Sequence, residues 1–466
     1  MSEAKVVPAP TISASQVVAE LRASYRNSKT KSLGWRMAQL ASLRRMLVEN
    51  EESISSAIAR DLGKPRFESY TTEISFLIAE IDHSRKHLAK WMKPTRVKSS
   101  LVVQPASSKI YKDPLGVVLV IGAWNYPLQL SLGPVIGAIA AGNCVVVKPS
   151  EVSQHTSEIM AGLMPHYMDQ DCVRVVEGGI PETTELLEQK WDYIFYTGNG
   201  HVGKIILAAA AKHLTPVTLE LGGKSPAIVD KDVDIRVAAK RIVWGKFTNA
   251  GQTCVAPDYI LAHEEIHDRL VEALKSAILE FYGDSPIESD DYGRIINERH
   301  HSRLVKLLES GTIAHGGRHE ASEKYIEPTL LTEVTADSAL MSDEIFGPLL
   351  PILKVSSVDE AIEFINERPK PLALYVFTKN KQVSQQVIAN TSSGGGCINH
   401  VLIHLIVPGL PFGGVGESGM GGYHGQHSFD LFTHHKSILD KPTLIDPSLQ
   451  YPPYNDFKKK ILKRLL

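Results

Sequence analysis

The strongest constraint on the fold of this 466-residue chain is a regular alternation of strand and helix patterns that begins at Gly116. Short, almost continuously apolar runs are separated by segments with helical spacing. The runs cover residues 117–121, 144–147, 173–176, 193–196 and 217–219, and the helical segments cover 128–141, 152–164, a short stretch from 182, and 202–212. Apolar strands that alternate with helices are typical of a parallel sheet covered on both faces. The sequence therefore predicts a doubly wound, nucleotide-binding type of α/β domain.

A second stretch with the same alternation follows Gly222 and predicts a second α/β domain. Its strands and helices are expected at 233–247, 259–262, 266–281, 350–355, from 358, at 372–377 and from 382, with a turn-rich middle. Glycine-dense segments at 394–396, 411–416 and 419–422 predict loops where the backbone approaches a ligand or another domain. Before Gly116, residues 13–93 have helical spacing. Residues 98–111 predict a hairpin of the kind that can be lent to a partner subunit.

The composition is that of an ordinary globular chain and excludes several kinds of protein. Hydrophobic residues make up 43% and charged residues 22%, which suits two or three domains. A formal net charge of -2 offers no field for nucleic acid. The four cysteines are far apart and predict neither a metal site nor a disulfide framework, so a reducing, cytoplasmic compartment is expected. Residues 1–10 lack an apolar signal core, and the longest apolar segment, 115–141, is interrupted by Asn125, Pro127 and Pro134.

A glycine-rich turn predicts a site for a dinucleotide. The run from Gly198 to Gly203, GNGHVG, follows a predicted strand and opens a predicted helix, so it matches G-x-G-x-x-G in the required context. Its amides would attract a pyrophosphate. On this interpretation Glu220 is the acid that holds a ribose, but Lys148 and Glu151 at the end of the second strand compete for that role. The residues alone leave both possibilities open.

A single cysteine lies in a second polar loop. Residues 247–259 read FTNAGQTCVAPDY, so Cys254 is expected on a tight loop that enters a strand. A thiol there can act as a nucleophile, because a few per cent of free cysteine is thiolate at neutral pH. The competing interpretation is a buried small hydrophobe, the common fate of a free cysteine.

Two further patterns have weaker meanings. Residues 263–267, HEEIH, match the zinc-protease pattern H-E-x-x-H, but His263 is expected to end a strand, so the five residues would straddle a turn. Residues 457–466 place Phe457, Ile461, Leu462 and Leu465 on one helical face among basic residues. That tail is too short to span a membrane, and it predicts either a membrane-surface helix or a solvated one.

Seven short motifs together resemble one family, the aldehyde dehydrogenases. They are GAWNYP (122–127), KPSE (148–151), YTG (196–198), LELGGK (219–224), GQTC (251–254), EIFGP (344–348) and PFGGVG (411–416). They run in family order over almost the whole chain. The forms AWNYP, CVAPDY and GMGGYHG (419–425) look most like the class 3 and fatty aldehyde dehydrogenase branch.

The resemblance implies a division of the chain and a set of reacting residues. It implies a Rossmann-like NAD(P)-binding domain at 1–96 and 112–221, a catalytic domain at 222–422, a small β bridging or oligomerisation element at 97–111 and 423–445, and a basic tail at 446–466. Cys254 is implied as the nucleophile and Glu220 as the general base rather than a ribose ligand. Asn125 and the Cys254 amide are the implied oxyanion donors. The expected reaction is oxidation of medium- or long-chain aliphatic or aromatic aldehydes to carboxylates.

The resemblance also implies how the cofactor and substrate are held. NAD is expected, with NADP also accepted, and the implied cofactor contacts are Trp124, Lys148, Glu151, Gly198, Asn199, Gly203, Leu221, Glu344 and Phe346. Tyr126 and Phe412 are implied to line the aldehyde channel. A homodimer is expected, with membrane contact through the tail. Two alternatives remain, namely an acylating enzyme that releases its thioester to coenzyme A, and a non-catalytic protein on the same fold.

Overall fold

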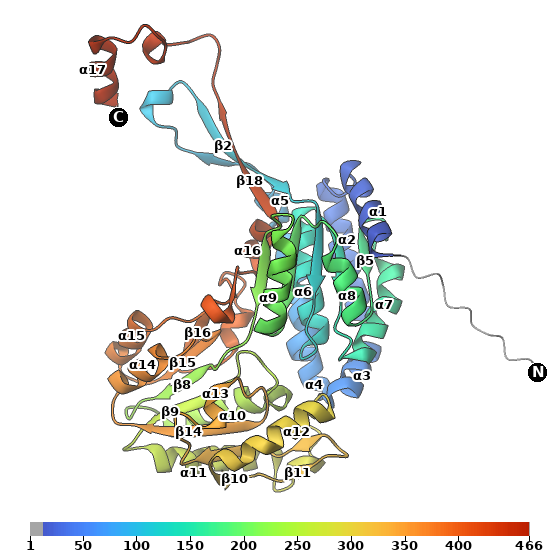
Figure 1. Ribbon diagram of the computed structural model, residues 1–466, viewed down its shortest axis with the longest axis vertical. Coiled ribbons are helices and arrows are strands. Elements are labelled where there is room, and N and C mark those ends of the chain that lie inside the picture. Colours follow the sequence, from blue (N-terminus) through green and yellow to red (C-terminus); the bar gives the residue numbers. More distant parts are fainter. Residues whose placement is uncertain (1–12, 466) are drawn as a thin grey trace, which may run out of the picture.

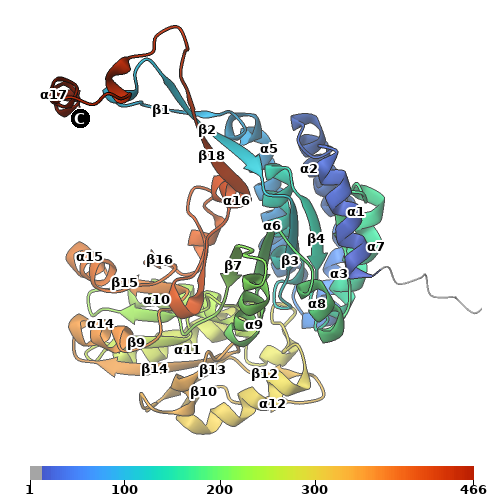
Figure 2. The same cartoon turned by 45° about the horizontal axis from the view of Figure 1, so that its top comes forward.

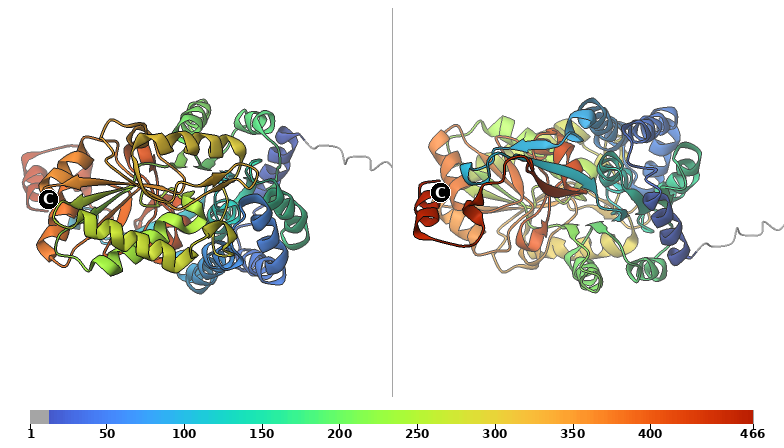
Figure 3. Two further views of the ribbon diagram at one scale, coloured as in Figure 1. Left: turned by 90° about the horizontal axis from the view of Figure 1, so that it is seen from below. Right: turned by 90° about the horizontal axis from the view of Figure 1, so that it is seen from above.

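The computed structural model describes residues 13–465. Figure 1 shows two α/β bodies joined side by side and a narrow arm that projects from the first body. Seen from below and above (Figure 3), the N-terminal helices and the C-terminal segment lie at opposite ends of the molecule. The expectation for residues 1–10 lies outside the described part of the chain. Within residues 13–465, none of the helices has the length and apolar character needed to cross a membrane.

The first body contains a six-stranded sheet with strand order β17-β7-β6-β3-β4-β5. β3 to β7 are parallel, whereas β17 pairs antiparallel with β7. The strands are β3 (Val117–Ile121), β4 (Cys144–Lys148), β5 (Val173–Val175), β6 (Tyr193–Thr197), β7 (Val217–Glu220) and β17 (Gly419–Met420). The connecting helices are α6 (Pro127–Ala141), α7 (Gln154–Tyr167), α8 (Ile180–Leu187) and α9 (Gly200–Ala211). The predicted doubly wound sheet is thus present, because each fully apolar run is buried on both faces.

The second body contains a seven-stranded sheet with strand order β10-β13-β14-β9-β8-β15-β16. It is parallel apart from β10. The strands are β8 (Pro226–Val229), β9 (Tyr259–His263), β10 (Thr312–His315), β13 (Thr329–Thr332), β14 (Leu349–Val355), β15 (Ala373–Phe377) and β16 (Gly395–Ile398). Its helices include α10 (Ile235–Phe247), α11 (His267–Tyr282), α12 (Glu298–Leu307), α13 (Ala339–Ser342), α14 (Val358–Asn366) and α15 (Lys381–Asn390), and a small hairpin pairs β11 (His319–Glu320) with β12 (Tyr325–Ile326).

The N-terminal segment is helical, as its spacing predicts. It forms α1 (Ala14–Arg26), α2 (Leu33–Glu49), α3 (Glu51–Leu62), α4 (Arg66–Ser69), a π-helix at Tyr70–Ile74, and α5 (Ser75–Trp91). These helices cover the first sheet, since α2 and α5 pack on α6 and α3 packs on α7.

The arm is a three-stranded sheet that includes the region in which a hairpin is expected, residues 98–111. β1 (Thr95–Val97) and β2 (Ser107–Pro114) flank a short turn, and β18 (Thr433–Asp440) pairs with β2 along its whole length. α16 (Gly425–Leu431) leads into β18, and α17 (Asp456–Leu465) ends the described chain. Figure 2 shows the arm and α17 standing clear of both bodies.

The loop prediction for the glycine-dense segments was wrong at two places. Gly395 and Gly396 begin β16, and Gly419 begins β17. A Cβ atom on Gly396 would lie 2.0 Å from the Leu374 carbonyl oxygen, and one on Gly419 would lie 2.1 Å from the Leu219 carbonyl oxygen. The glycines therefore permit close approach within a sheet, which a count of glycines does not distinguish from a loop.

The two sheets meet end to end, with the carboxyl ends of the strands in the first sheet facing the amino ends of the strands in the second. The chain leaves the carboxyl end of β7 at Glu220 and enters the amino end of β8 at Pro226, so residues 221–225 alone join the sheets there. Loops at the carboxyl edge of the first sheet consequently face loops at the amino edge of the second. This junction contains the candidate site.

Candidate active site

Most of the predicted site residues lie where the two sheets face each other. Asn125 follows β3, Gly198 follows β6 and Glu220 ends β7, whereas Cys254 precedes β9 and Glu344 precedes β14. In the first sheet the strand order reverses at β3, since β4 lies on one side and β6 on the other. Ligands of open α/β sheets bind at the carboxyl ends of the strands beside such a switch point.

The loop that carries the thiol is tightly wound. Asn249, Ala250 and Gly251 have φ values of 54°, 50° and 75°. A Cβ atom on Gly251 would lie 2.3 Å from the Gly347 carbonyl oxygen, so glycine is required there. The Gln252 amide ties the loop to the second body, because it donates to the Arg294 carbonyl at 2.9 Å and accepts from the Ile296 amide at 3.0 Å.

The surroundings of the Cys254 thiol favour its protonated form. The side chain retains some exposed surface. Burial raises its pKa, and the Glu344 and Glu220 carboxyls raise it further. The backbone amides of Cys254 and Val255 oppose this effect. A nearby base or a change in local charge is therefore needed to form the thiolate.

Glu220 has the features of a general base. The residue is 2% exposed, and neither carboxyl oxygen has a hydrogen-bond partner. Burial raises its pKa well above the usual range. A buried polar group without a partner is rare and costly in a folded protein. Its effect on the Cys254 pKa shows that the two side chains share one environment.

Asn125 is held between the two bodies. Its side-chain Nδ2 donates to the Gln252 carbonyl at 3.0 Å, and its own carbonyl accepts from Asn249 Nδ2 at 2.8 Å. The amide group retains a second N–H hydrogen for another acceptor. Sequence reasoning missed Asn249, although an Asn before Ala-Gly in a turn was a usable signal for left-handed backbone.

The predicted cofactor residues of the first body lie along one edge. Lys148 ends β4 with its side chain buried, and its Nζ donates to the Pro149 carbonyl at 2.7 Å and to Glu151 at 3.4 Å. Burial lowers the pKa of Lys148, which Glu151 partly restores. Asn199 caps α9 by accepting from the Val202 amide at 3.0 Å.

Two glycines fit this edge closely. A Cβ atom on Gly198 would lie 2.1 Å from the Tyr196 hydroxyl oxygen, and one on Gly203 would lie 3.2 Å from a Leu221 methyl group. The turn from Gly198 to Gly203 therefore packs closely against Tyr196 and Leu221 where α9 begins.

Glu344 and Phe346 lie opposite, on the second body. Burial and, to a smaller extent, Asp258 raise the pKa of Glu344 to about 8, although the Gly223 amide opposes the shift. A Cβ atom on Gly222 would lie 1.9 Å from the Glu344 carboxyl, so only glycine leaves room for it. Phe346 has φ 49°, and its ring meets the edge of Trp124 at 5.3 Å. A buried carboxyl in a glycine cradle beside aromatic rings suits a ribose and a planar heterocycle.

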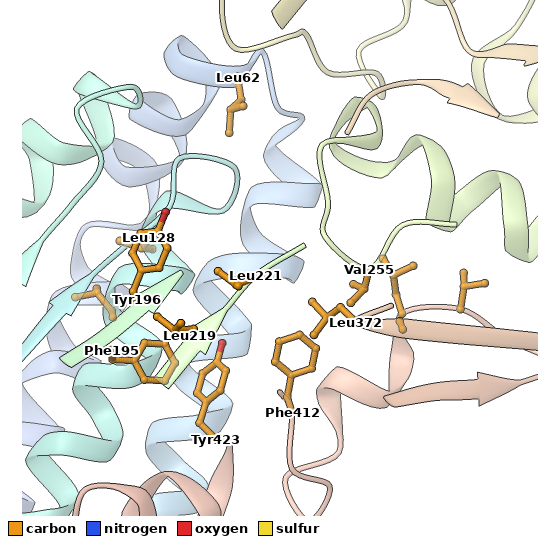
Figure 4. Packing of buried hydrophobic residues seen from close by; sticks show 14 of the residues in the cluster. Leu62, Leu128, Phe195, Tyr196, Leu219, Leu221, Val255, Leu372, Phe412 and Tyr423 are labelled. Carbon is orange, nitrogen blue, oxygen red and sulfur yellow. The ribbon is translucent and has the colours of Figure 1, made fainter. Parts of the chain in front are cut away.

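Apolar side chains from both bodies face one another beside the thiol loop. In Figure 4, Phe412, Leu372 and Val255 lie across from Tyr423, Leu219 and Leu221. The Phe412 ring stacks on His424 at 5.5 Å and meets Tyr423 edge-on at 5.9 Å. Tyr423 was not identified from the sequence, because a lone tyrosine after glycines carries no distinctive pattern.

Tyr126 has polar partners in addition to its expected position near the substrate. The residue is 7% exposed, its hydroxyl lies 2.7 Å from the Thr253 hydroxyl, and the Lys64 ammonium lies 3.8 Å from its ring centre. Lys64 also escaped sequence reasoning, because a charged residue after a helix end is ordinarily exposed.

The H-E-x-x-H pattern does straddle a turn. His263 ends β9 and His267 begins α11, so the two imidazoles are not on one helix face. His267 Nδ1 instead lies 2.7 Å from the Asp268 carboxylate.

Comparison with known proteins gives a consistent result. The model of the family described as "Aldehyde dehydrogenase family" matches residues 4–438. The chain is 53% identical to the "Aldehyde dehydrogenase, dimeric NADP-preferring" of Rattus norvegicus, over 95% of this chain and 98% of that protein. It is 50% identical to the "Aldehyde dehydrogenase family 3 member H1" of Arabidopsis thaliana, over 97% and 95%. The solved structure of the substrate-bound Staphylococcus aureus AldH is similar with a TM-score of 0.95 and 48% identity, over 97% and 98%.

Proposed function

This chain belongs to the aldehyde dehydrogenase family and is an NAD(P)-dependent aldehyde-oxidising enzyme, and we propose that its reaction passes through a thioester on Cys254 with Glu220 as the general base. The observation that carries this proposal is the Glu220 carboxyl, which is 2% exposed, lacks any hydrogen-bond partner and shares the environment of the thiol. A structural carboxylate would be paired, whereas a base must keep its oxygens free for a proton.

In the first half of the reaction, the Cys254 thiol loses its proton to solvent and the sulfur attacks the aldehyde carbon, so Glu220 stays ionised for the second half. The tetrahedral oxyanion that forms is stabilised by the free N–H of the Asn125 side chain and by the Cys254 backbone amide. Removal of one such donor commonly costs about a hundredfold or more in rate. NAD or NADP, when bound, would supply the hydride acceptor for this carbon, and loss of the hydride would leave a thioester on Cys254.

In the second half, Glu220 removes a proton from a water molecule that attacks the thioester carbonyl. The same two N–H donors stabilise the second oxyanion, and collapse releases the carboxylate and restores the thiol. A carboxyl whose pKa is raised by burial is a stronger base than an exposed one once it is ionised.

The cofactor residues support the use of NAD and NADP. Lys148 and Glu151 are proposed to hold the adenosine ribose, the turn from Gly198 to Gly203 the pyrophosphate, and Glu344 the nicotinamide ribose. Trp124, Leu221 and Phe346 are proposed to bound the nicotinamide. The side chain of Glu151 is about half exposed, so it can turn away from a 2′-phosphate. The "NADP-preferring" description of the rat relative supports acceptance of the second cofactor.

Two variants test the role of the thiol and the base. Cys254→Ser is expected to abolish NADH formation, and Glu220→Gln is expected to release one equivalent of NADH in a burst and then stall. Full steady-state turnover by either variant would contradict its assigned role. Coenzyme A is then added to the wild-type enzyme, and formation of an acyl-coenzyme A product in place of the free acid would identify an acylating enzyme.

The apolar faces near the thiol favour medium- or long-chain aliphatic or aromatic aldehydes as substrates. The rings of Phe412 and Tyr423 lie edge to face, 5.9 Å apart between centres, where the two bodies meet. We expect kcat/KM to rise with aliphatic chain length and to be substantial for benzaldehyde. A preference for acetaldehyde over longer chains would contradict this substrate class.

A homodimer is proposed, in agreement with the description "dimeric" of the rat relative. Support comes from β18, which forms an edge of the arm sheet and is exposed at every position after Thr433. Exposed edge strands readily pair with another chain. We also propose the division into domains at 1–96 with 112–221, 222–422, and 97–111 with 423–445. The sheets support it in outline, although β17 joins the first sheet, β1 begins at Thr95 and β2 continues to Pro114.

The tail gives a basis for peripheral membrane contact by a cytoplasmic enzyme. α17 lies beside the turn at the arm tip, residues 101–103. Phe457 in the lysine-rich helix α17 and Leu101 in the turn beside it are each 71% exposed. Co-sedimentation with anionic vesicles should fall when residues 457–466 are deleted. Unchanged sedimentation would remove this proposal.

A further inference from the structure

We propose that the buried ion pair between Lys64 and Glu73 is a positioning device that sets the Asn125 loop and the Cys254 loop in their reacting arrangement. The inference rests on the proposed function of Cys254 and Asn125. It concerns residues of the N-terminal helices that belong to none of the family motifs in the sequence.

The ion pair is completely enclosed. Lys64 Nζ lies 2.7 Å from Glu73 Oε1, and both side chains have 0% exposure. Glu73 is in the π-helix at Tyr70–Ile74, between α4 and α5. A π-turn adds one residue to the helix and so rotates the side chains that follow, a distortion found frequently at functional sites. Here the side chain of Glu73 is directed into the protein rather than to solvent.

Glu73 fixes the helix that follows the Asn125 loop. Its second oxygen, Oε2, accepts from the backbone amides of Leu128 at 2.9 Å and Gln129 at 3.3 Å. These are free amides in the first turn of α6, where a carboxylate is favoured by the helix dipole. Since Asn125 lies only two residues before Pro127, the first residue of α6, this contact sets the position of its side chain.

Lys64 fixes the loop that carries the nucleophile. Its ammonium group lies 3.8 Å from the centre of the Tyr126 ring, a cation–π contact in a buried place. The Tyr126 hydroxyl in turn lies 2.7 Å from the Thr253 hydroxyl. Thr253 is 6% exposed and directly precedes Cys254. A short chain of contacts therefore connects Lys64 to the backbone of the nucleophile.

The same segment makes a third contact. Glu68 Oε2 accepts from the Asn249 backbone amide at 2.9 Å, and the Asn249 side chain donates to the carbonyls of both Asn125 and Gln252. Residues 64–73 thus contact both reacting loops, which belong to different sheets. A buried ion pair contributes little net stability compared with an apolar pair of similar size. Directional positioning is the function for which its charges are suited.

The decisive variant is the double substitution Lys64→Met and Glu73→Gln. It removes both charges of the pair, and the glutamine oxygen can still cap α6. Glu68, whose pKa Lys64 lowers, becomes easier to protonate in this variant. We expect a folded dehydrogenase whose NADH burst and whose alkylation of Cys254 by iodoacetamide are each at least tenfold slower. The KM for NAD should be unchanged, because the adenosine edge is not touched. A folded double variant with the wild-type burst rate would overturn the inference.

Tyr126→Phe provides a second test that does not depend on whether the double variant folds. It removes the hydroxyl that reaches Thr253 and retains the ring over Lys64. We expect a slower burst in the wild-type background and little further loss in the double-variant background, because the contacts act in series. An unchanged burst for Tyr126→Phe, or purely additive losses, would show that the ion pair acts on stability alone.

The matched control is Lys112→Met. Lys112 is a largely buried lysine that pairs with Asp430 at 2.6 Å and lies 5.3 Å from the Phe429 ring centre, at the root of the arm. This variant should lower thermal stability and leave the burst rate unchanged. A wild-type enzyme without any burst, together with turnover by Cys254→Ser, would instead refute the proposed function itself.

Discussion

At the residue scale, Glu220 illustrates a conflict between stability and chemistry. The glycine-rich turn pointed to it as a ribose ligand, whereas its buried, unpartnered carboxyl at the end of β7 favours the role of a base. A pattern of glycines cannot distinguish the two roles, because it fixes a distance along the chain and not the direction of a side chain. The structure supplies that direction.

The buried carboxyl has a predictable effect on stability. Its folded pKa is raised above the unfolded value near 4.5. The folded state therefore holds a proton that the unfolded state loses, and stability falls as pH rises from about 4.5 through the folded pKa. The loss is about 1.4 kcal/mol per pH unit over that window. The Glu220→Gln variant should lack this pH-dependent loss. In urea unfolding, the difference between its free energy of unfolding and that of the wild type should therefore grow in its favour from pH 5 to pH 8.

Glu188→Gln provides the control, because Glu188 is exposed at the end of α8. Its unfolding free energy should follow the wild-type pH profile. Parallel profiles for Glu220→Gln and wild type would show that the Glu220 carboxyl is ionised and solvated in the folded enzyme.

Gly222 is predicted to be essential for cofactor affinity. In Gly222→Ala the new methyl group would occupy the place of the Glu344 carboxyl. Because Glu344 is a flexible side chain, the protein should fold, but with the carboxyl displaced. We expect the KM for NAD to rise about tenfold, roughly the loss of one hydrogen bond to a charged group. Gly162→Ala, where nothing lies within 4 Å of the new atom, should leave kinetics unchanged; equal effects of both would contradict the prediction.

At the element scale, periodicity predicted most of the longer strands and helices, whether almost fully apolar like α6 or amphipathic like α11, and missed several short or polar ones. The helix expected at 128–141 is present as α6, and the strand expected at 350–355 is present as β14. The π-helix was not predictable, since one extra residue within 13–93 hardly alters a helical pattern. β8, β13 and α12 also went unrecognised, because their short or polar sequences lie within turn-rich stretches.

β18 is the element on which assembly is predicted to depend. Ile438 and Leu439 are 41% and 50% exposed on this edge strand. Replacement of both with lysine should keep the β2 pairing but place charge on the free edge, which disfavours pairing with another chain. Sedimentation equilibrium should then give the monomer mass. The control is Leu444→Lys, at a 94% exposed position beyond the strand, which should leave the mass at its wild-type value. If the double lysine variant is also a dimer, the interface lies elsewhere.

At the scale of the whole molecule, the residues predicted for the cofactor come from both bodies, so cofactor binding should stabilise them together. A ligand at a hundred times its Kd adds about 2.7 kcal/mol to the free energy of unfolding. Calorimetry should show one cooperative transition that moves to higher temperature with NAD and, to some extent, with NADP. Lys148→Met should reduce the shift, and Lys90→Met, on the exposed face of α5, should not. A shift of equal size in both variants would exclude Lys148 from the cofactor site.

The arrangement of the two bodies is also where sequence reasoning was least complete. Motifs identified Cys254, Glu220, Asn125 and Glu344 separately, and only the opposed edges of the sheets bring them together. Lys64, Glu73 and Asn249 belong to no motif, because their importance lies in which distant loops they contact. Such contacts depend on tertiary packing and leave little trace in local sequence.

The direct passage from β7 to β8 has a consequence for insertions and deletions. Residues 221–225 connect Glu220 at the end of β7 directly to β8. A single added residue is expected to change the position of Glu220 relative to the thiol loop. The hairpin of β11 and β12, by contrast, ends in the exposed turn 321–323. Scanning the gene with short insertions should therefore recover active clones at 321–323 and none at 221–225. The number of residues between β7 and β8 is therefore as strictly constrained as their identity. Homologues are expected to differ in loop length elsewhere in the chain rather than at 221–225.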